Sequence, residues 1–289
     1  MTEATNERPL LSVRVSVDYK GKPGVLRDVS LDIGRGEIVG LVGESGSGKS
    51  TLALALLQLL QLKGAMVRGE IVFQGENLIQ KSERQLRAMR GRQMSVVLQS
   101  PLTSLNPALR IGAQLREAWR AHATGSREEC LNAVRATLKS LRLPDDDEFL
   151  KRRPSQLSVG QGQRVTIAMA ILHRPALLIA DEATSALDTI TQSEILRLFA
   201  ELNRELNMAI LFISHDLLSV ATLCHRVAIL NDGQIVECDT PAVIFDSAGH
   251  PYTRQLIAAL PGRPPSGAAQ KPSDRFPEEF VSAGIPQHH

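Results

Sequence analysis

Aromatic residues are scarce in this chain of 289 residues, where Phe, Trp and Tyr together make up 3%. Proteins that stack nucleic acid bases need several exposed rings, so this composition argues against such a platform. Charge of one sign is not in excess either, because 33 Lys and Arg face 31 Asp and Glu. A formal net charge of +2 gives no electrostatic reason to bind a polyanion. We therefore expect no nucleic acid partner.

Cysteines and long apolar runs are also few. Cys130, Cys224 and Cys238 are scattered without metal-ligand spacing, so we expect small buried side chains in a reducing compartment. Residues Met1–Leu10 lack the apolar run of a signal peptide. The apolar stretch Leu52–Leu60 is shorter than the ~18 residues that a membrane span needs. We expect a soluble chain that reaches a membrane only through a partner.

Short apolar runs rich in Val, Ile and Leu alternate with helical patterns along the chain. This alternation is typical of an α/β fold with a parallel sheet and crossover helices. The pair Asp232-Gly233 between the last two runs indicates a hairpin turn. The expected strands are Glu37–Val42, Glu70–Phe73, Met94–Leu98, Ala176–Ala180, Ala209–Ile213, Val227–Leu230 and Gln234–Glu237.

Helices are indicated by apolar stripes that follow capping signals. Ser126 with Glu129 fits a capping box before one stripe, and Thr191 with Glu194 fits a second box before another. Residues 99–175 are mainly helical in pattern and exceed a simple crossover, which predicts an inserted helical subdomain at about 100–165. Beyond residue 261, Pro, Gly, Ser and charged residues dominate, so we expect residues 262–289 to form a disordered tail.

A phosphate-binding motif follows the first of these strands. The pattern G-x-x-x-x-G-K-S/T, here called the phosphate loop, is formed by Gly43, Glu44, Ser45, Gly46, Ser47, Gly48, Lys49, Ser50 and Thr51. Its glycines let backbone N–H groups turn toward phosphates, and the next helix adds its positive end. Lys49 is expected to reach the β- and γ-phosphates of ATP, and the Ser50 hydroxyl to bind Mg²⁺. The alternative is an ordinary glycine-rich turn.

Two acids end the apolar strand that begins at Ala176. The carboxyl ends of parallel strands are where α/β sheets bind ligands, so Asp181 is suited to hold Mg²⁺. Glu182 is then placed to polarise the attacking water. Taken alone, the pair could equally cap a strand end, but the phosphate loop favours a hydrolytic site.

The segment Leu157-Ser158-Val159-Gly160-Gln161 resembles the signature motif of ATP-binding cassette (ABC) ATPases, normally Leu-Ser-Gly-Gly-Gln. The resemblance covers residues 10–261. It implies an ABC-type P-loop fold with a mostly parallel sheet, an antiparallel β subdomain and the inserted helical subdomain. Further landmarks occur in family order. Tyr19 is similar to the aromatic residue that stacks on adenine, Gln99 to the glutamine that contacts Mg²⁺, and His215 to the histidine that contacts the γ-phosphate.

The resemblance also implies a dimer in which two cassettes close head to tail on two ATP molecules. Ser158, Gly160 and Gln161 would then serve the partner's ATP. Val159 departs from the family pattern, where Gly is usual. Its branched side chain is expected to crowd the partner's nucleotide, although a tolerated substitution is the equal alternative.

Two stretches, residues 100–107 and 250–256, resemble the dipeptide, oligopeptide and nickel importer subfamily. The resemblance implies an ATPase subunit at the cytoplasmic face of the membrane. Its expected partners are two permease subunits, a second and non-identical ATPase subunit and, indirectly, an extracytoplasmic solute-binding protein. The rivals are a soluble ABC ATPase without a transporter, and a P-loop phosphotransferase that leaves the signature motif unexplained. The cargo, peptide or nickel, stays open.

Overall fold

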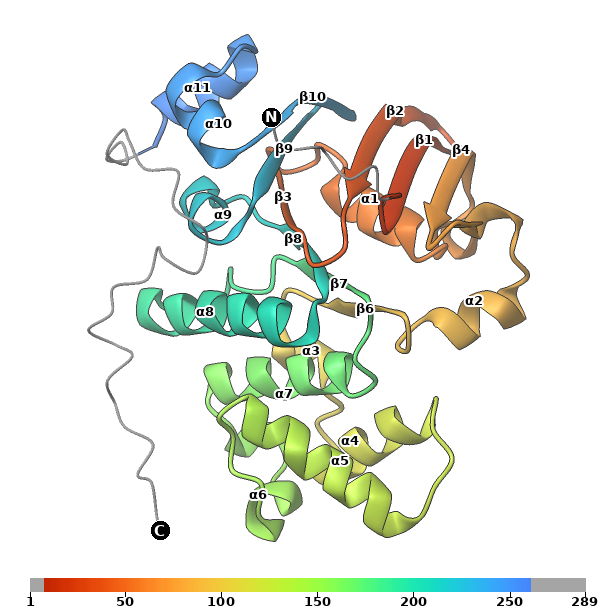
Figure 1. The fold of residues 1–289 in the computed structure, drawn as a ribbon, viewed down its shortest axis with the longest axis vertical. Coiled ribbons are helices and arrows are strands. Elements are labelled where there is room, and N and C mark those ends of the chain that lie inside the picture. The colour runs from red at the N-terminus through yellow and green to blue at the C-terminus, as the bar shows by residue number, and fades with distance from the viewer. Residues whose placement is uncertain (1–7, 261–289) are drawn as a thin grey trace.

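The computed structural model describes residues 8–260, and the tail predicted at 262–289 lies outside these residues. The described chain forms two sheets with helices packed between and around them, and its helical segment extends away from the sheets (Figure 1). None of the described helices is long and apolar enough to cross a membrane.

The larger sheet has the order β10-β9-β3-β8-β7-β6. All of its neighbouring strands are parallel except β10, which pairs antiparallel with β9 across the predicted turn at Asp232-Gly233. The mostly parallel sheet of the predicted fold class is thereby confirmed. Its strands are β3 Ile38–Val42, β6 Met94–Val97, β7 Leu177–Asp181, β8 Ala209–Ile213, β9 Arg226–Asn231 and β10 Gln234–Asp239.

Both faces of the parallel strands are buried, and successive side chains point to opposite faces. In β8, Leu211 and Ile213 join the cluster that contains α1 (Lys49–Leu56) and the smaller sheet. Ile210 and Phe212 join the cluster on the other face, which contains α8 (Thr189–Leu206) and α9 (Leu217–Leu223). Two apolar cores, one on each face of the larger sheet, therefore hold the carboxyl ends of its parallel strands together at one edge of that sheet.

The smaller sheet is antiparallel and has the order β2-β1-β4-β5. It comprises β1 Leu11–Tyr19, β2 Lys22–Ile33, β4 Ala65–Phe73 and β5 Glu76–Asn77. The expected strands include none within residues 11–33, although the family resemblance implies an antiparallel subdomain. The signal was present, because Leu11, Val13, Val15 and Val17 alternate with half-buried residues and fill one face.

Residues 99–175 contain helices and no strand. They form α3 Pro101–Ser104, α4 Ile111–Arg120, α5 Arg127–Ser140, α6 Asp147–Lys151 and α7 Val159–Ile171. The remaining α-helices are α2 Glu83–Met89, α10 Pro241–Ser247 and α11 Pro251–Ala258. The exact limits of the helical subdomain, about 100–165, stay a prediction.

One predicted capping box is confirmed and one is wrong. The Ser126 hydroxyl accepts a hydrogen bond from the Glu129 amide, and the Glu129 carboxylate accepts one from the Ser126 amide. At α8 the cap is Asp188, which accepts from the Thr191 amide at 3.0 Å. Thr191 therefore lies inside the helix, because the stronger acceptor three residues earlier starts it first.

The cysteines form no disulfide in the described structure. Cys130 and Cys224 are buried, as expected. Cys238 differs, because it is only half-buried and its Sγ accepts a hydrogen bond from the Arg226 guanidinium at 3.2 Å.

Candidate active site

The phosphate loop joins the carboxyl end of β3 to the amino end of α1. Gly48 has φ 111° and precedes α1, a conformation that side chains rarely adopt. A Cβ on Gly43 would lie 2.1 Å from the Leu230 carbonyl oxygen, so only glycine lets this segment pass so close to β9. A pocket of about 300 Å³ opens above the loop. Its lining residues are Tyr19, Lys22, Val25, Ser45, Gly46, Gly48, Lys49, Ser50, Thr51 and Glu182.

Lys49 forms the floor of this pocket. Its side chain is buried, and Nζ donates to the carbonyl oxygens of Gly43 at 2.8 Å and Glu44 at 2.9 Å. Burial lowers the pKa of the Lys49 amine, while the charges of Glu182 and Asp181 act in the opposite direction. The loop thus holds a partly desolvated ammonium group that anionic oxygens in the pocket would stabilise.

Asp181 is the last residue of β7 and lies close enough to Lys49 to interact with its charge. Its Oδ1 is buried and has no hydrogen-bond partner among residues 8–260. Burial raises the pKa of the carboxyl, and contact with Ser50 only partly opposes this shift. A buried carboxylate oxygen without a donor is suited to a hard cation, and the neighbouring Ser50 hydroxyl could supply a second oxygen.

We expect Asp181→Asn to raise the melting temperature of the nucleotide-free protein at neutral pH, by about 2–4 °C for each 1 kcal/mol gained. The folded-state pKa of Asp181 is raised, so this group subtracts from stability at every pH above its unfolded pKa. The variant should also lose any stabilisation by Mg²⁺ together with ATP. Thermal melts with and without MgATP measure both effects, and a lower melting temperature without ligand would contradict the first.

Glu182 follows directly and adopts φ 50°, in the left-handed region that is costly for a residue with a side chain. Its amide donates to the Ile213 carbonyl at 2.9 Å, and its own carbonyl accepts from the Ser185 hydroxyl. This turn directs the carboxylate to the pocket, where Oε1 lies 3.6 Å from Nδ1 of His215. The structure thereby brings together two residues that the sequence places 33 positions apart.

Tyr19 and Gln99 were predicted to contact adenine and Mg²⁺. Tyr19 ends β1 and lines the same pocket as the phosphate loop. Gln99 is exposed and follows β6, whose carboxyl end lies beside that of β7 because the two strands are parallel. Gln99 is thus at the same sheet edge as Asp181, but it is not among the residues that line the pocket.

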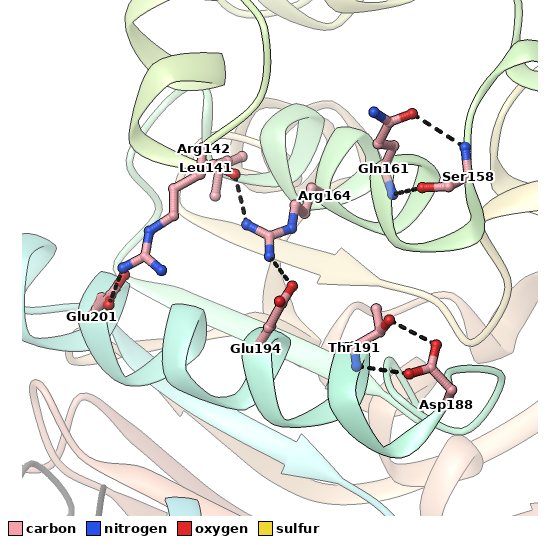
Figure 2. Close-up of polar contacts among 9 residues, drawn as sticks. All are labelled: Leu141, Arg142, Ser158, Gln161, Arg164, Asp188, Thr191, Glu194 and Glu201. Atoms are coloured by element: carbon pink, nitrogen blue, oxygen red, sulfur yellow. Dashed lines mark hydrogen bonds and ion pairs between the residues drawn. The ribbon is translucent and has the colours of Figure 1, made fainter. Parts of the chain in front are cut away.

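The signature residues lie apart from this pocket, at the amino end of α7 (Figure 2). The Ser158 hydroxyl accepts from the Gln161 amide, and the Gln161 side chain accepts from the Ser158 amide, each at 3.2 Å. Val159 is 46% exposed in the first turn. The helix thus presents its positive end and a small polar side chain to the surface.

Contacts with α8 fix the direction of α7. A Cβ on Gly160 would lie 2.8 Å from Cγ2 of Thr191, so glycine lets the two helix starts approach. Figure 2 shows Arg164 pointing from α7 to Glu194 on α8. Its guanidinium donates to the Glu194 carboxylate at 2.7 Å. The same guanidinium donates to the Leu141 carbonyl at 3.0 Å. The signature turn and the start of α8 are therefore held in one fixed arrangement.

Sequence reasoning missed two contributions to this region. Lys22 and Val25 of β2 line the pocket. They are missing from the predicted site because β2 is not among the strands expected from the sequence. The hydroxyl of Tyr252 in α11 accepts a hydrogen bond from the Glu44 amide at 3.3 Å. The segment containing Tyr252 carries a subfamily resemblance in its sequence, but no local pattern predicts that it lies beside the phosphate loop.

Comparisons with known proteins identify the family and the fold. The family model described as ABC transporter matches residues 26–185. The glutathione import ATP-binding protein GsiA of Salmonella choleraesuis (strain SC-B67) is 42% identical over 270 residues, covering 90% of this chain and 43% of that protein. The GsiA protein of Escherichia coli (strain K12) is 43% identical over 246 residues, covering 83% and 40%. The chain therefore spans less than half the length of these relatives.

Solved structures of similar fold include cbiO1 from Clostridium perfringens, described as part of the ABC transporter complex cbiONQ. Its TM-score is 0.73 at 26% identity, over 88% of this chain and 96% of that one. The ATP-binding cassette MJ0796, solved as a dimer bound to ADP and Pi, has a TM-score of 0.69 at 28% identity, over 80% and 98%.

Proposed function

Because the chain belongs to the ABC transporter family, we propose that it binds MgATP in the pocket above Lys49 and hydrolyses it as the ATPase subunit of an importer. The observation that carries this proposal is the placement of Lys49 beside Asp181 and Glu182. Lys49 and Glu182 line one pocket, and Asp181, whose buried Oδ1 has no hydrogen-bond partner in the described chain, is near enough to Lys49 and Ser50 to interact with both. An ammonium group beside two carboxylates is suited to phosphoryl transfer to water.

Each residue has a separate task in this mechanism. The phosphate-loop amides and Lys49 bind and orient the phosphates, and Tyr19 packs against the base. Ser50 and Asp181, with Gln99, would hold Mg²⁺, which neutralises charge on the phosphate oxygens when bound. Glu182 orients the attacking water and accepts its proton. His215, beside Glu182, donates to the γ-phosphate.

The same proposal assigns the signature turn to a neighbouring cassette. Its exposure and its separation from the pocket leave Ser158, Gly160 and Gln161 available to phosphates bound by another subunit. The MJ0796 cassette, solved as a dimer, supports the pairing of two cassettes. The second cassette is proposed to be a non-identical homologue.

Val159 is the residue that departs from the signature pattern. We expect Val159→Gly to raise the ATPase activity of the assembled complex, because removal of an exposed branched side chain relieves crowding at the partner's nucleotide. Val159→Ala, which keeps Cβ but removes the branch, should fall between the two. Steady-state phosphate release measures the series, and equal rates for all three proteins would show that the substitution is tolerated.

We propose the transport role for this chain because its relatives are import proteins. These relatives are named for glutathione import, which supports cargo of the small-peptide class, whereas nickel has no such support. We propose that two permease subunits anchor the chain at the cytoplasmic face of the membrane, and that a solute-binding protein delivers cargo from the other side. The exposed segment around Gln99 and α3 is the proposed contact with a permease.

Co-purification tests the transport role. Tagged chain, expressed in its native cell and extracted in mild detergent, is expected to retain integral membrane subunits. A chain that hydrolyses ATP but retains no membrane protein would favour the alternative, a soluble ABC ATPase. A chain that binds no ATP would contradict both the importer function and the soluble ATPase alternative.

A further inference from the structure

The segment His250–Leu256 has no task in the mechanism above. It forms the start of α11, with the His250 side chain as the cap that accepts from the Tyr252 amide at 3.2 Å. Tyr252 is half-buried and packs against the core cluster that also covers one face of the parallel sheet. Its ring is therefore held by apolar packing, which leaves the hydroxyl as the part that can act on a neighbour.

The turn before α11 is fixed from two sides. Glu237 of β10 accepts from the amide of Gly249 at 2.7 Å and from that of His250 at 3.3 Å. Arg254, one turn into α11, donates to the carbonyl oxygens of Ala248 at 3.1 Å and Gly249 at 2.6 Å. The two Glu237 contacts tie the turn to β10, and the two Arg254 contacts tie α11 to the same turn, so the position of Tyr252 is defined by more than its own packing.

The Tyr252 hydroxyl meets the phosphate loop at Glu44, whose amide donates to it at 3.3 Å. Glu44 is also the residue whose carbonyl accepts from Nζ of Lys49 at 2.9 Å and from the Ser47 amide at 3.2 Å. One peptide segment thus connects α11 to the lysine that reaches the phosphates. Because Glu44 itself is exposed, the tyrosine supplies a fixed partner where water would otherwise be the only one.

We propose that Tyr252 is a positioning residue, which holds the Gly43–Ser45 part of the phosphate loop ready to receive the phosphates of a nucleoside triphosphate. The inference rests on the proposed ATP site. A loop that is already ordered loses less conformational freedom when it binds, so the hydroxyl increases affinity for nucleotide. Tyr252 touches no reacting atom, and the rate of the chemical step at saturation should not depend on it.

Binding of MgATP to the full chain tests the proposal with Tyr252→Phe, which keeps the ring and removes the hydroxyl. We expect the dissociation constant to rise about fivefold, the typical effect of one neutral hydrogen bond, while the melting temperature and the kcat of the assembled complex stay unchanged. Gln255→Ala, at an exposed position of the same helix, is the matched control and should leave affinity unchanged.

Arg254→Gln provides a second test that does not depend on the tyrosine variant folding. This substitution loosens the turn and should also raise the dissociation constant for MgATP. The double variant Arg254→Gln with Tyr252→Phe should show no further rise if Arg254 acts through the hydroxyl. Unchanged affinity in both variants would overturn the proposal, as would a lower melting temperature with unchanged affinity, since that indicates a structural role only. Failure of the unmodified chain to bind MgATP would instead reject the proposed function.

Discussion

Replacement of Lys49 by Ala is expected to lower the ATPase rate of this chain's own site by at least about a hundredfold, the typical cost of losing one preorganised electrostatic group. The buried Nζ supplies a positive charge that is already desolvated and oriented by two carbonyl oxygens before any nucleotide arrives. No reorganisation is then needed when charge builds up on the γ-phosphate. Single-turnover phosphate release, with ATP bound at this site, measures the loss.

Lys22→Ala is the matched control, because it removes one positive charge from the lining of the same pocket. Lys22 is exposed at the start of β2, so water screens its charge and the rate should change only a fewfold. An assembled complex that keeps full activity with Lys49→Ala would mean that the second subunit's site is sufficient. Comparable losses in both variants would indicate a general effect of net charge.

Glu182→Gln is expected to lower hydrolysis by about 10²–10⁴-fold while leaving ATP affinity nearly unchanged. The amide preserves the shape of the side chain and its place beside His215, but it cannot accept a proton from water. ATP should therefore accumulate on the protein without being cleaved. Binding of radiolabelled ATP, compared with release of labelled phosphate, separates the two quantities.

The exposed Glu205 on α8 offers a control with the same change of charge far from the pocket, and Glu205→Gln should retain full activity. A Glu182→Gln protein that hydrolyses ATP normally would exclude Glu182 as the base. Loss of ATP binding in that variant would point to the strained backbone at this residue, where φ is 50°, as the feature that matters.

Local motifs carried most of what the sequence could predict. The phosphate loop and the acids at Asp181 and Glu182 depend on short spacings and on the ends of strongly apolar strands, which a single sequence displays directly. The Thr191 box failed for a related reason. Two acceptors, Asp188 and Thr191, competed to start the same helix, and their spacing alone does not decide between them.

Contacts between distant segments could not be predicted in the same way. Glu44 and Tyr252 are separated by 208 positions and meet only because β10 lies two strands from β3 in the larger sheet. The order of strands in that sheet is set by the burial of both faces, a property of the whole core. Lys22 shows the same limit, because its place in the pocket depends on how β2 pairs with β1.

The junction of α7 and α8 also determines how a mechanical load passes through the molecule. Sliding α7 along α8 would part Arg164 from Glu194 and leave a guanidinium that is 12% exposed without its counter-charge. It would also move Thr191 away from Gly160, the position where the lack of a Cβ leaves room for the Thr191 methyl group. We therefore expect α7 and α8 to move as one rigid unit. A displacement of the segment before α7 would then be transmitted to the loop that ends at Asp188.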